Sequence, residues 1–282
     1  MIAAAKKCSI CPHECLLTEG GYGICGARRY EDGEIVNASY GQVTALSLDP
    51  IEKKPLACFY PGSSILSVGS YGCNLSCQFC QNYDIAQPQN IDKIHTHFIE
   101  PDSLVEYAVL ERQRGNIGLA FTYNEPFVSW EFMRDCARLN HASGQLNVAV
   151  TNGYVLPAVW EKSLDLIDAF NIDLKSFSDE GYKKVGAPHG FSVVKDNILA
   201  AHAAGVHLEL TTLVVPGLSD DEDMFVRECD WISSIDENIP LHITRFFPSF
   251  KLNDTQPTSR TLLNRFRGIA EKRLSRVFVG NV

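Results

Sequence analysis

The chain has 282 residues, of which 45% are hydrophobic and 21% charged, as is usual for a globular protein. It carries 34 acidic and 25 basic residues, and the net charge of −9 gives no general attraction to nucleic acid or anionic membrane. No apolar run approaches the roughly 20 residues that span a bilayer, and the first residues lack the pattern of a signal peptide. We therefore expect a cytoplasmic protein with no nucleic-acid or membrane partner. Its ten cysteines favour metal ligation over a disulfide scaffold.

The first segment of the chain is rich in cysteine and glycine. Four cysteines lie in it, separated by two, three and nine residues: Cys8, Cys11, Cys15 and Cys25. Four thiols at this spacing fit either a closed tetrahedral zinc site or a fully ligated second iron–sulfur cluster. His13 could substitute for one ligand, but a neighbouring surface histidine is the simpler interpretation. We predict that residues 1–57 form a cysteine-rich N-terminal segment, a metal knuckle followed by a short β-rich connection.

A second group of cysteines follows a short apolar run, residues 65–68. Three thiols fall within eight residues in the spacing C-x3-C-x2-C: Cys73, Cys77 and Cys80. A structural zinc site normally takes four protein ligands, so three thiolates indicate a metal centre with an open position. An iron–sulfur cubane held by three cysteines would keep its fourth iron free for another ligand. Three buried free thiols are the plain alternative.

From residue 65 onward, predicted strands and helices alternate along the chain. Apolar runs predict six strands: residues 65–68, 117–122, 147–151, 170–174, 207–214 and 241–244. Helical spacing predicts six helices: residues 102–114, 129–140, 157–167, 193–204, 221–235 and 259–274. Six strands alternating with helices imply parallel pairing with right-handed crossovers. The predicted fold is α/β, a partial (β/α)6 TIM-like barrel formed by residues 58–282.

Unusual polar motifs follow these strands one after another. The second, third and fourth strands end in TYNEP (122–126), TNG (151–153) and DLK (173–175). The fifth and sixth run into VPG (215–217) and RFFP (245–248). Because the carboxyl ends of parallel strands meet at one rim, these motifs predict a single site around the second cysteine group.

Each motif also has a structural interpretation. Glu125 could cap the following helix, TNG is a common turn signal, and VPG could only shape the backbone. Asp173 and Lys175 face the same side of one strand, where charges are costly unless paired or liganded, so they favour a functional site. The remaining cysteines are isolated and are interpreted as buried thiols: Cys58, Cys136 and Cys229.

The C-x3-C-x2-C spacing, with an aromatic residue before the last cysteine, resembles the signature of the radical S-adenosylmethionine (SAM) superfamily. Residues 171–176 (NIDLKS) and 213–221 (LVVPGLSDD) resemble its glycyl-radical-enzyme activating branch, which includes the pyruvate formate-lyase activating enzyme. The chain more closely resembles the radical SAM family of the AmmeMemoRadiSam gene group. That resemblance covers most of the chain and rests on residues 8–28, 48–61, 72–82 and 241–246.

The resemblance implies a radical SAM oxidoreductase. By it, Cys73, Cys77 and Cys80 would hold a [4Fe–4S] cluster, and SAM would chelate the open iron. Five residues would surround SAM: Asn124 and Glu125 at its amine, and Thr151, Asp173 and Lys175 around its carboxylate and ribose. A low-potential donor such as flavodoxin or ferredoxin would supply an electron, and a 5′-deoxyadenosyl radical would take hydrogen from the substrate. No catalytic residue beyond the cluster is implied.

The resemblance leaves the substrate open. The activating branch implies a glycine backbone on a partner protein, a glycyl radical enzyme, whereas a small molecule or another protein residue is the alternative target. A non-enzymatic iron–sulfur electron carrier or sensor is an alternative of another class, but a carrier has no reason to keep polar motifs at six strand ends. Two departures from the activating-enzyme pattern concern the SAM contacts. Val150 stands where an acidic residue is common, and Phe247 where histidine is common.

Overall fold

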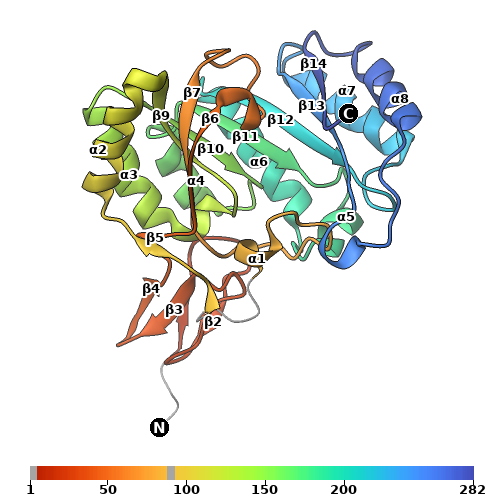
Figure 1. The fold of residues 1–282 in the computed structure, drawn as a ribbon. Helices are drawn as coiled ribbons and strands as arrows, with labels where there is room; N and C mark the ends of the chain where they lie inside the picture. Colours follow the sequence, from red (N-terminus) through yellow and green to blue (C-terminus); the bar gives the residue numbers. More distant parts are fainter. Residues whose placement is uncertain (1–4, 88–92) are drawn as a thin grey trace.

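The computed structural model describes residues 5–87 and 93–282, and its central feature is an eight-stranded sheet (Figure 1). In spatial order its strands are β14 (Val277–Gly280), β13 (Leu241–Arg245), β12 (His207–Val214), β11 (Ala169–Leu174), β10 (Leu146–Thr151), β9 (Asn116–Phe121), β7 (Ser64–Gly69) and β6 (Ala45–Pro50). Every neighbouring pair is parallel except β6 with β7, which is antiparallel. The predicted α/β partial barrel is confirmed.

The sheet has two strands more than the six that the sequence predicts, and both are edge strands. β6 lies before residue 58, in the part of the chain assigned to the N-terminal segment, and pairs with β7 over six residues. Its solvent-facing positions make its apolar pattern weak. β14 is the apolar end of the chain, and all four of its residues are only partly buried. Edge strands bury less surface, so their sequences carry less of the apolar signal.

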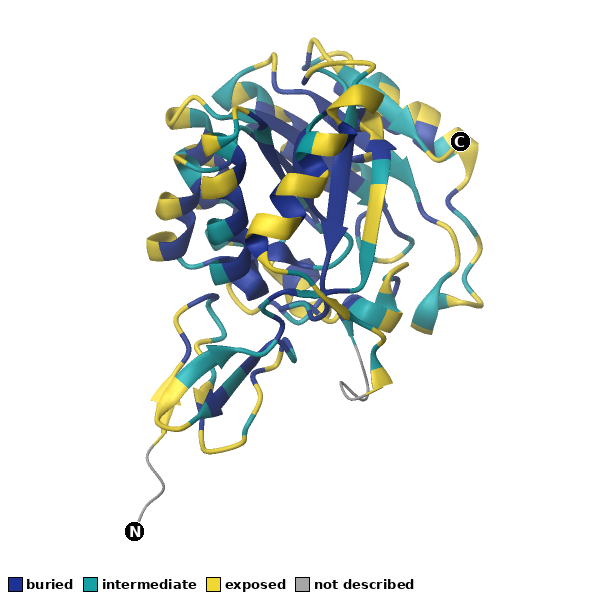
Figure 2. Ribbon diagram, turned by 60° about the vertical axis from the view of Figure 1, so that its left-hand side comes forward, coloured by how far each residue is buried: buried dark blue, intermediate teal, exposed yellow. Residues whose placement is uncertain are grey.

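Helices cover the outer face of the sheet. Six of them correspond to the predicted helices: α2 (Pro101–Leu110), α3 (Trp130–Ala142), α4 (Pro157–Leu164), α6 (Gly190–Ala203), α7 (Glu222–Ile235) and α8 (Arg260–Ala270). Figure 1 shows α2 and α3 at one end of the sheet and α7 and α8 at the other. In Figure 2 the strands are mostly dark blue and the helices carry yellow outward faces, which is the expected amphipathic pattern. No helix among residues 5–87 and 93–282 is long and apolar enough to cross a membrane.

Residues 51–62, which we call the plug segment, close the inner side of the barrel at the amino ends of the strands. The segment packs on the sheet through a small apolar cluster, in which Ile51, Leu56 and Phe59 contact strand residues Ile65, Ala120, Val148 and Ala169. The buried carboxylate of Glu209 accepts hydrogen bonds from the backbone N–H groups of Ala57 (3.0 Å) and Cys58 (2.8 Å). It also lies 2.9 Å from Nε2 of His207 and 2.6 Å from Nε2 of His242. Cys58 of the plug segment was predicted to be a buried thiol, but it is only half-buried. The same prediction is correct for Cys136 and Cys229, which are fully buried.

The N-terminal part consists of small hairpins packed against the barrel, drawn near α1 (Tyr83–Ala86) in Figure 1. Its hairpins pair β1 (Lys6–Lys7) with β2 (Leu16–Leu17) and β3 (Arg28–Glu31) with β4 (Glu34–Asn37). The short strand β5 (Gln42–Val43) pairs with β8 (His97–Phe98), which comes later in the chain. Arg28 donates a hydrogen bond from Nη2 to Glu131 of α3 at 2.9 Å. The Tyr40 hydroxyl donates to Asp135 of the same helix at 2.9 Å. Since β6 also belongs to the main sheet, a domain boundary at residue 57 stays a prediction.

Candidate active site

One cavity of about 360 Å³ lies where the carboxyl ends of the strands meet the second cysteine group. It is lined by all eight residues that the sequence predicts for this site: Cys73, Cys77, Cys80, Asn124, Glu125, Thr151, Asp173 and Lys175. These residues come from the loop after β7 and from the ends of β9, β10 and β11. The structure therefore brings together side chains that are up to about 100 positions apart in the sequence.

Of the three cysteines in this cavity, Cys77 is buried, and Cys73 and Cys80 are half-buried. Burial raises the pKa of Cys77 to about 11 and that of Cys73 well above its ordinary value. The backbone N–H of Leu75 donates to the Cys73 sulfur at 3.4 Å, and the Asn152 amide donates to it at 3.8 Å. Buried thiols of this kind stay protonated near neutral pH unless a cationic centre binds the thiolate.

The number of these thiols discriminates between metal centres. A structural zinc site normally takes four protein ligands, whereas a cubane held by three cysteines keeps one iron open for another ligand. No other cysteine of the described chain lines the cavity. The set therefore fits a cubane with one open iron better than a mononuclear zinc site.

Glu125 connects the ends of two strands behind the thiols. Its carboxylate accepts hydrogen bonds from the Thr151 hydroxyl (2.8 Å), the Asn152 N–H (2.8 Å) and the Phe127 N–H (3.1 Å). The last of these caps the short helix η4 (Pro126–Ser129), so the structural interpretation of Glu125 is correct. Burial nevertheless raises the pKa of Glu125 to about 7, because it outweighs these three donors.

Asn124 fixes the backbone that leads into the cysteine loop. Its Oδ1 accepts from the Ser70 N–H at 3.1 Å, and its Nδ2 donates to the Gly72 carbonyl at 3.0 Å. Gly72 directly precedes Cys73. The asparagine of the TYNEP motif therefore sets the position at which the first thiol enters the cavity.

Asp173 and Lys175 form an ion pair at the end of β11, with Nζ and Oδ2 2.8 Å apart. Their position on one side of the strand is as predicted. Burial disfavours the ammonium, but Asp173 and the Cys77 thiol outweigh it and raise the pKa of Lys175. The same ammonium opposes the burial that raises the pKa of Cys77. A fixed positive charge is thus held beside the thiols.

The motifs that follow the fifth and sixth predicted strands do not line this cavity. VPG (215–217) lines a neighbouring cavity of about 230 Å³ with Gln78 and Phe79. The RFFP motif lines neither, and the two strands contribute residues from within their length: Thr211, Leu213 and Thr244. The chain turns away after β12 because the Ser219 hydroxyl donates to the Leu213 carbonyl (2.6 Å) and accepts from the Val215 N–H (2.9 Å). The prediction that the polar motifs form a single site is therefore wrong for VPG and RFFP.

Sequence reasoning missed a basic group on the wall of the cavity. Lys53 and Lys54 of the plug segment line it, and both ammonium groups contact Asp49, at 3.1 Å and 2.9 Å. The Tyr123 hydroxyl donates to the same carboxylate at 2.7 Å, and the Lys54 ammonium lies 4.7 Å from the Tyr123 ring centre. The KKP sequence at residues 53–55 was a visible signal, but nothing local indicated that the plug segment turns inward.

His13 is not the surface histidine that the sequence suggested. Its Nε2 lies 2.8 Å from the carbonyl oxygen of Asn74 in the cysteine loop, and its ring meets Tyr154 edge-on, with centres 5.3 Å apart. The Asn74 side chain accepts a hydrogen bond from Asn152 at 2.8 Å. The N-terminal segment therefore contacts the cysteine loop directly.

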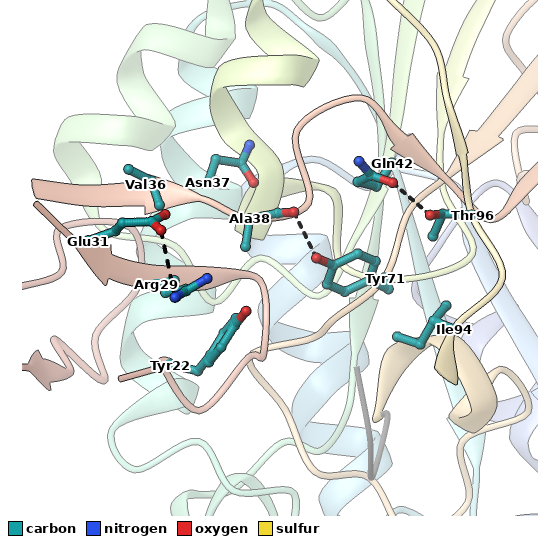
Figure 3. A pocket seen from close by; sticks show the side chains of 10 residues that line it. All are labelled: Tyr22, Arg29, Glu31, Val36, Asn37, Ala38, Gln42, Tyr71, Ile94 and Thr96. Carbon is teal, nitrogen blue, oxygen red and sulfur yellow. Dashed lines mark hydrogen bonds and ion pairs between the residues drawn. The ribbon is translucent and has the colours of Figure 1, made fainter. Parts of the chain in front are cut away.

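A further cavity of about 440 Å³ lies beside the β3–β4 hairpin and contains no thiol (Figure 3). Figure 3 shows three contacts among its lining residues: Arg29 with Glu31, Tyr71 with the Ala38 carbonyl, and Gln42 with Thr96. The Nε of Arg29 is buried without a hydrogen-bond partner among the described residues, but none of the predicted site residues lines this cavity. We therefore place the candidate chemistry at the cavity of the strand ends.

Comparison with known proteins decides the family. The model described as Radical SAM superfamily matches residues 67–229, which is more than half of the chain and includes the cysteine loop and β9 to β12. The chain belongs to the radical SAM superfamily. Membership implies a [4Fe–4S] cluster and SAM as cofactors and indicates an enzyme that works through radical chemistry. It favours an enzyme over the carrier or sensor considered above.

Relatives extend the likeness over nearly the whole chain. Uncharacterized protein MJ0808 of Methanocaldococcus jannaschii is 38% identical over 98% of this chain and 81% of its own length. Among solved radical SAM structures, a methyltransferase from Sphaerobacter thermophilus has a TM-score of 0.58 at 14% identity, covering 78% of this chain and 67% of its own. A domain of the pyruvate-formate lyase-activating enzyme from Bacteroides vulgatus has a TM-score of 0.50 at 18% identity, covering 58% and 99%. At identities of 14% and 18%, these two structures support the fold of the chain and not a particular activity.

Proposed function

We propose that this radical SAM protein holds a [4Fe–4S] cluster on Cys73, Cys77 and Cys80 and binds SAM at the open iron, in the cavity of the strand ends. The observation that carries the proposal is that these three thiols and five predicted SAM contacts line one cavity. With electron supply, the bound cofactors would provide a 5′-deoxyadenosyl radical that takes hydrogen from a substrate.

The protein's own residues would bind and orient SAM. Lys175, held by Asp173, offers a fixed ammonium for the SAM carboxylate, and Asp173 keeps one carboxylate oxygen for ribose or amine. Thr151 and Asn124 already use their polar groups on Glu125 and on the cysteine-loop backbone. They would therefore act by holding the cavity wall in place. The buried wall excludes water, which protects a reactive radical.

For the substrate, we propose a glycine backbone on a partner protein. The support is the likeness of residues 171–176 and 213–221 to the activating branch. A cavity of about 360 Å³ is near the lower limit of roughly 300–1,000 Å³ for pockets that hold one small molecule. SAM would fill much of it, leaving room for the tip of a protein loop. A compact anionic molecule that reaches Lys53 is the second candidate, because that ammonium is two-thirds exposed.

The test is reductive cleavage of SAM. The anaerobically reconstituted protein, given SAM and a low-potential reductant, should form 5′-deoxyadenosine. Cys77→Ala should abolish both cleavage and the iron of this site. Cys136→Ala, which removes a fully buried thiol outside the cavity, is the matched control and should keep both. Cleavage that survives Cys77→Ala would overturn the proposal.

The choice of substrate needs a second measurement. A glycyl radical enzyme added to the reaction should give the electron paramagnetic resonance doublet of a glycyl radical. Turnover of SAM with a small anionic molecule, and with no glycyl signal from any protein added, would favour the second candidate.

A further inference from the structure

The four N-terminal cysteines lie around one enclosed pocket. It is lined by Cys8, Cys11, Cys15 and Cys25 together with His13, Arg28 and Val128, among others. The β1–β2 hairpin places Cys8 opposite Cys15, because the Cys8 N–H donates a hydrogen bond to the Cys15 carbonyl at 2.9 Å. Glu14 turns the chain between them in the left-handed region (φ 44°), with its N–H donating to the Cys11 carbonyl. Four thiols spread over 18 residues thus converge.

Arg28 is a second, independent indication of a ligand. It is only 5% exposed, and its two terminal nitrogens are occupied by Glu131. Its Nε is buried and has no hydrogen-bond partner among the described residues. Arg28 lines the thiol pocket, and its charge acts on Cys8 and Cys25. A buried guanidinium N–H without a partner is costly, and a sulfur-rich anionic centre in this pocket would satisfy it.

The pocket is connected to the cysteine loop by backbone contact. The Cys25 carbonyl accepts a hydrogen bond from the Cys73 N–H at 3.2 Å. A Cβ on Gly72 would lie 2.4 Å from that carbonyl oxygen, so glycine is what permits the approach. The route from the Cys25 sulfur to the Cys73 sulfur therefore crosses covalent bonds and a single hydrogen bond.

These observations favour an iron–sulfur cluster over zinc. The thiols share one pocket, and the Cys25 backbone contacts that of Cys73, in the loop where the family implies a cluster. Zinc has no redox chemistry, so it would not use the short route to Cys73.

We infer that Cys8, Cys11, Cys15 and Cys25 hold an auxiliary [4Fe–4S] cluster that relays electrons to the cluster at Cys73, Cys77 and Cys80. One electron enters from a low-potential flavodoxin-like or ferredoxin-like donor and one leaves toward Cys73. The auxiliary cluster alternates between its 2+ and 1+ core states, and no bond forms or breaks. Cys15 is the least buried of the four and marks the side of entry. The relay role rests on the proposed function, whereas the metal site does not.

The site is tested in a variant that lacks the other cluster. Cys73, Cys77 and Cys80 are all replaced by alanine, and the protein is reconstituted anaerobically with iron and sulfide. We expect about four irons and four sulfides per chain and, after reduction, the paramagnetic signal of a [4Fe–4S] centre. One zinc per chain and no iron, or no metal at all, would overturn the inference. Neither readout depends on SAM cleavage, so failure of the proposed function is distinguishable.

The relay is tested by comparing two electron sources in the chain that keeps all three loop cysteines. In Cys11→Ser, the rate of 5′-deoxyadenosine formation with reduced flavodoxin should fall at least tenfold relative to the rate with dithionite. Cys58→Ser, which changes a half-buried thiol of the plug segment, is the matched control and should leave that ratio unchanged. An unchanged ratio in Cys11→Ser would overturn the relay.

Discussion

Two buried glutamates of this protein differ in how many hydrogen bonds their carboxyl groups accept. Glu125 and Glu228 are both fully buried, and burial raises the pKa of each to about 7. Glu125 accepts three hydrogen bonds, but Glu228 on α7 accepts one, from the Thr212 hydroxyl. A carboxyl with a single donor is best accommodated as the neutral acid.

The Glu228 carboxyl should make stability fall as pH rises. Its folded pKa lies above the ordinary value of 4.5, so between about pH 4.5 and 7 the folded protein keeps a proton that the unfolded chain has lost. The free energy of unfolding should therefore drop across this window, by about 3 kcal/mol from this group, and level off above pH 7. Glu228→Gln should lack this component and be more stable than the parent at pH 8, measured by urea unfolding. Glu222→Gln, a half-exposed carboxylate in the first turn of the same helix that pairs with Arg265, is the control. Parallel pH profiles for Glu228→Gln and the parent would contradict this.

The sequence predicted the positions of site residues where these residues lie close together in the chain. Cys73, Cys77 and Cys80, and the Asp173–Lys175 pair, were found because their spacing within one loop or strand already fixes their relative positions. The contacts of His13 with Asn74 and of Lys54 with Asp49 and Tyr123 depend on how separate segments pack together. Sequence spacing carries no information about them.

At the scale of elements, the cysteine loop and the N-terminal segment are held together through Gly72. Its φ of 92° lies in the left-handed region, and a Cβ there would collide with the Cys25 carbonyl oxygen. Both constraints act at one position, immediately before the first thiol of the site.

Gly72→Ala should therefore displace the cysteine loop. We expect a clear loss of iron at the Cys73 site and a melting temperature below that of the matched variant Gly62→Ala. Gly62 has a similar φ of 81°, but nothing lies within 4 Å of its added Cβ. Gly62→Ala should cost only the strain of about 1–2 kcal/mol and keep its iron. Equal iron content and melting temperature in both variants would show that the close approach does not matter.

The prediction of secondary structure was accurate for strands that are buried on both faces of the sheet. The six central strands were found nearly in full, since they read as continuous apolar runs between helices. Edge strands β6 and β14 escaped detection because they bury little. The predicted helix at 102–114 is α-helical only to Leu110 and continues as the 3₁₀ helix η3 (Glu111–Arg114), which ends at the left-handed Gly115. Helix ends of this kind are set by backbone geometry that apolar spacing does not encode.

For the whole molecule, Glu209 fastens the plug segment to the barrel. Burial would raise the pKa of this carboxyl, but His207, His242 and the N–H groups of Cys58 and Ala57 outweigh it and lower the pKa to about 2. The ionised form is therefore the one that stabilises the fold.

This carboxylate should make the protein sensitive to acid. A folded pKa below the ordinary value gives stability that is present above about pH 4.5 and is lost as pH falls from 4.5 toward 2. Glu209→Gln should be less stable than the parent at pH 6 and show a flatter decline between pH 5 and 3, followed by thermal unfolding. Glu52→Gln, an exposed carboxylate that bonds the Gly62 N–H in the same segment, should decline as the parent does. A decline of equal steepness in Glu209→Gln and the parent would contradict this role.

The plug segment also bears on the order of catalytic events. Because this segment packs into the amino end of the barrel, we expect cofactor and substrate to enter the cavity from the side of the strand ends. Under the proposed function, SAM would bind before the substrate, and the nucleoside product would leave after the product that is formed from the substrate. Steady-state kinetics should accordingly be ordered, with the second reactant giving inhibition at high concentration when it arrives first.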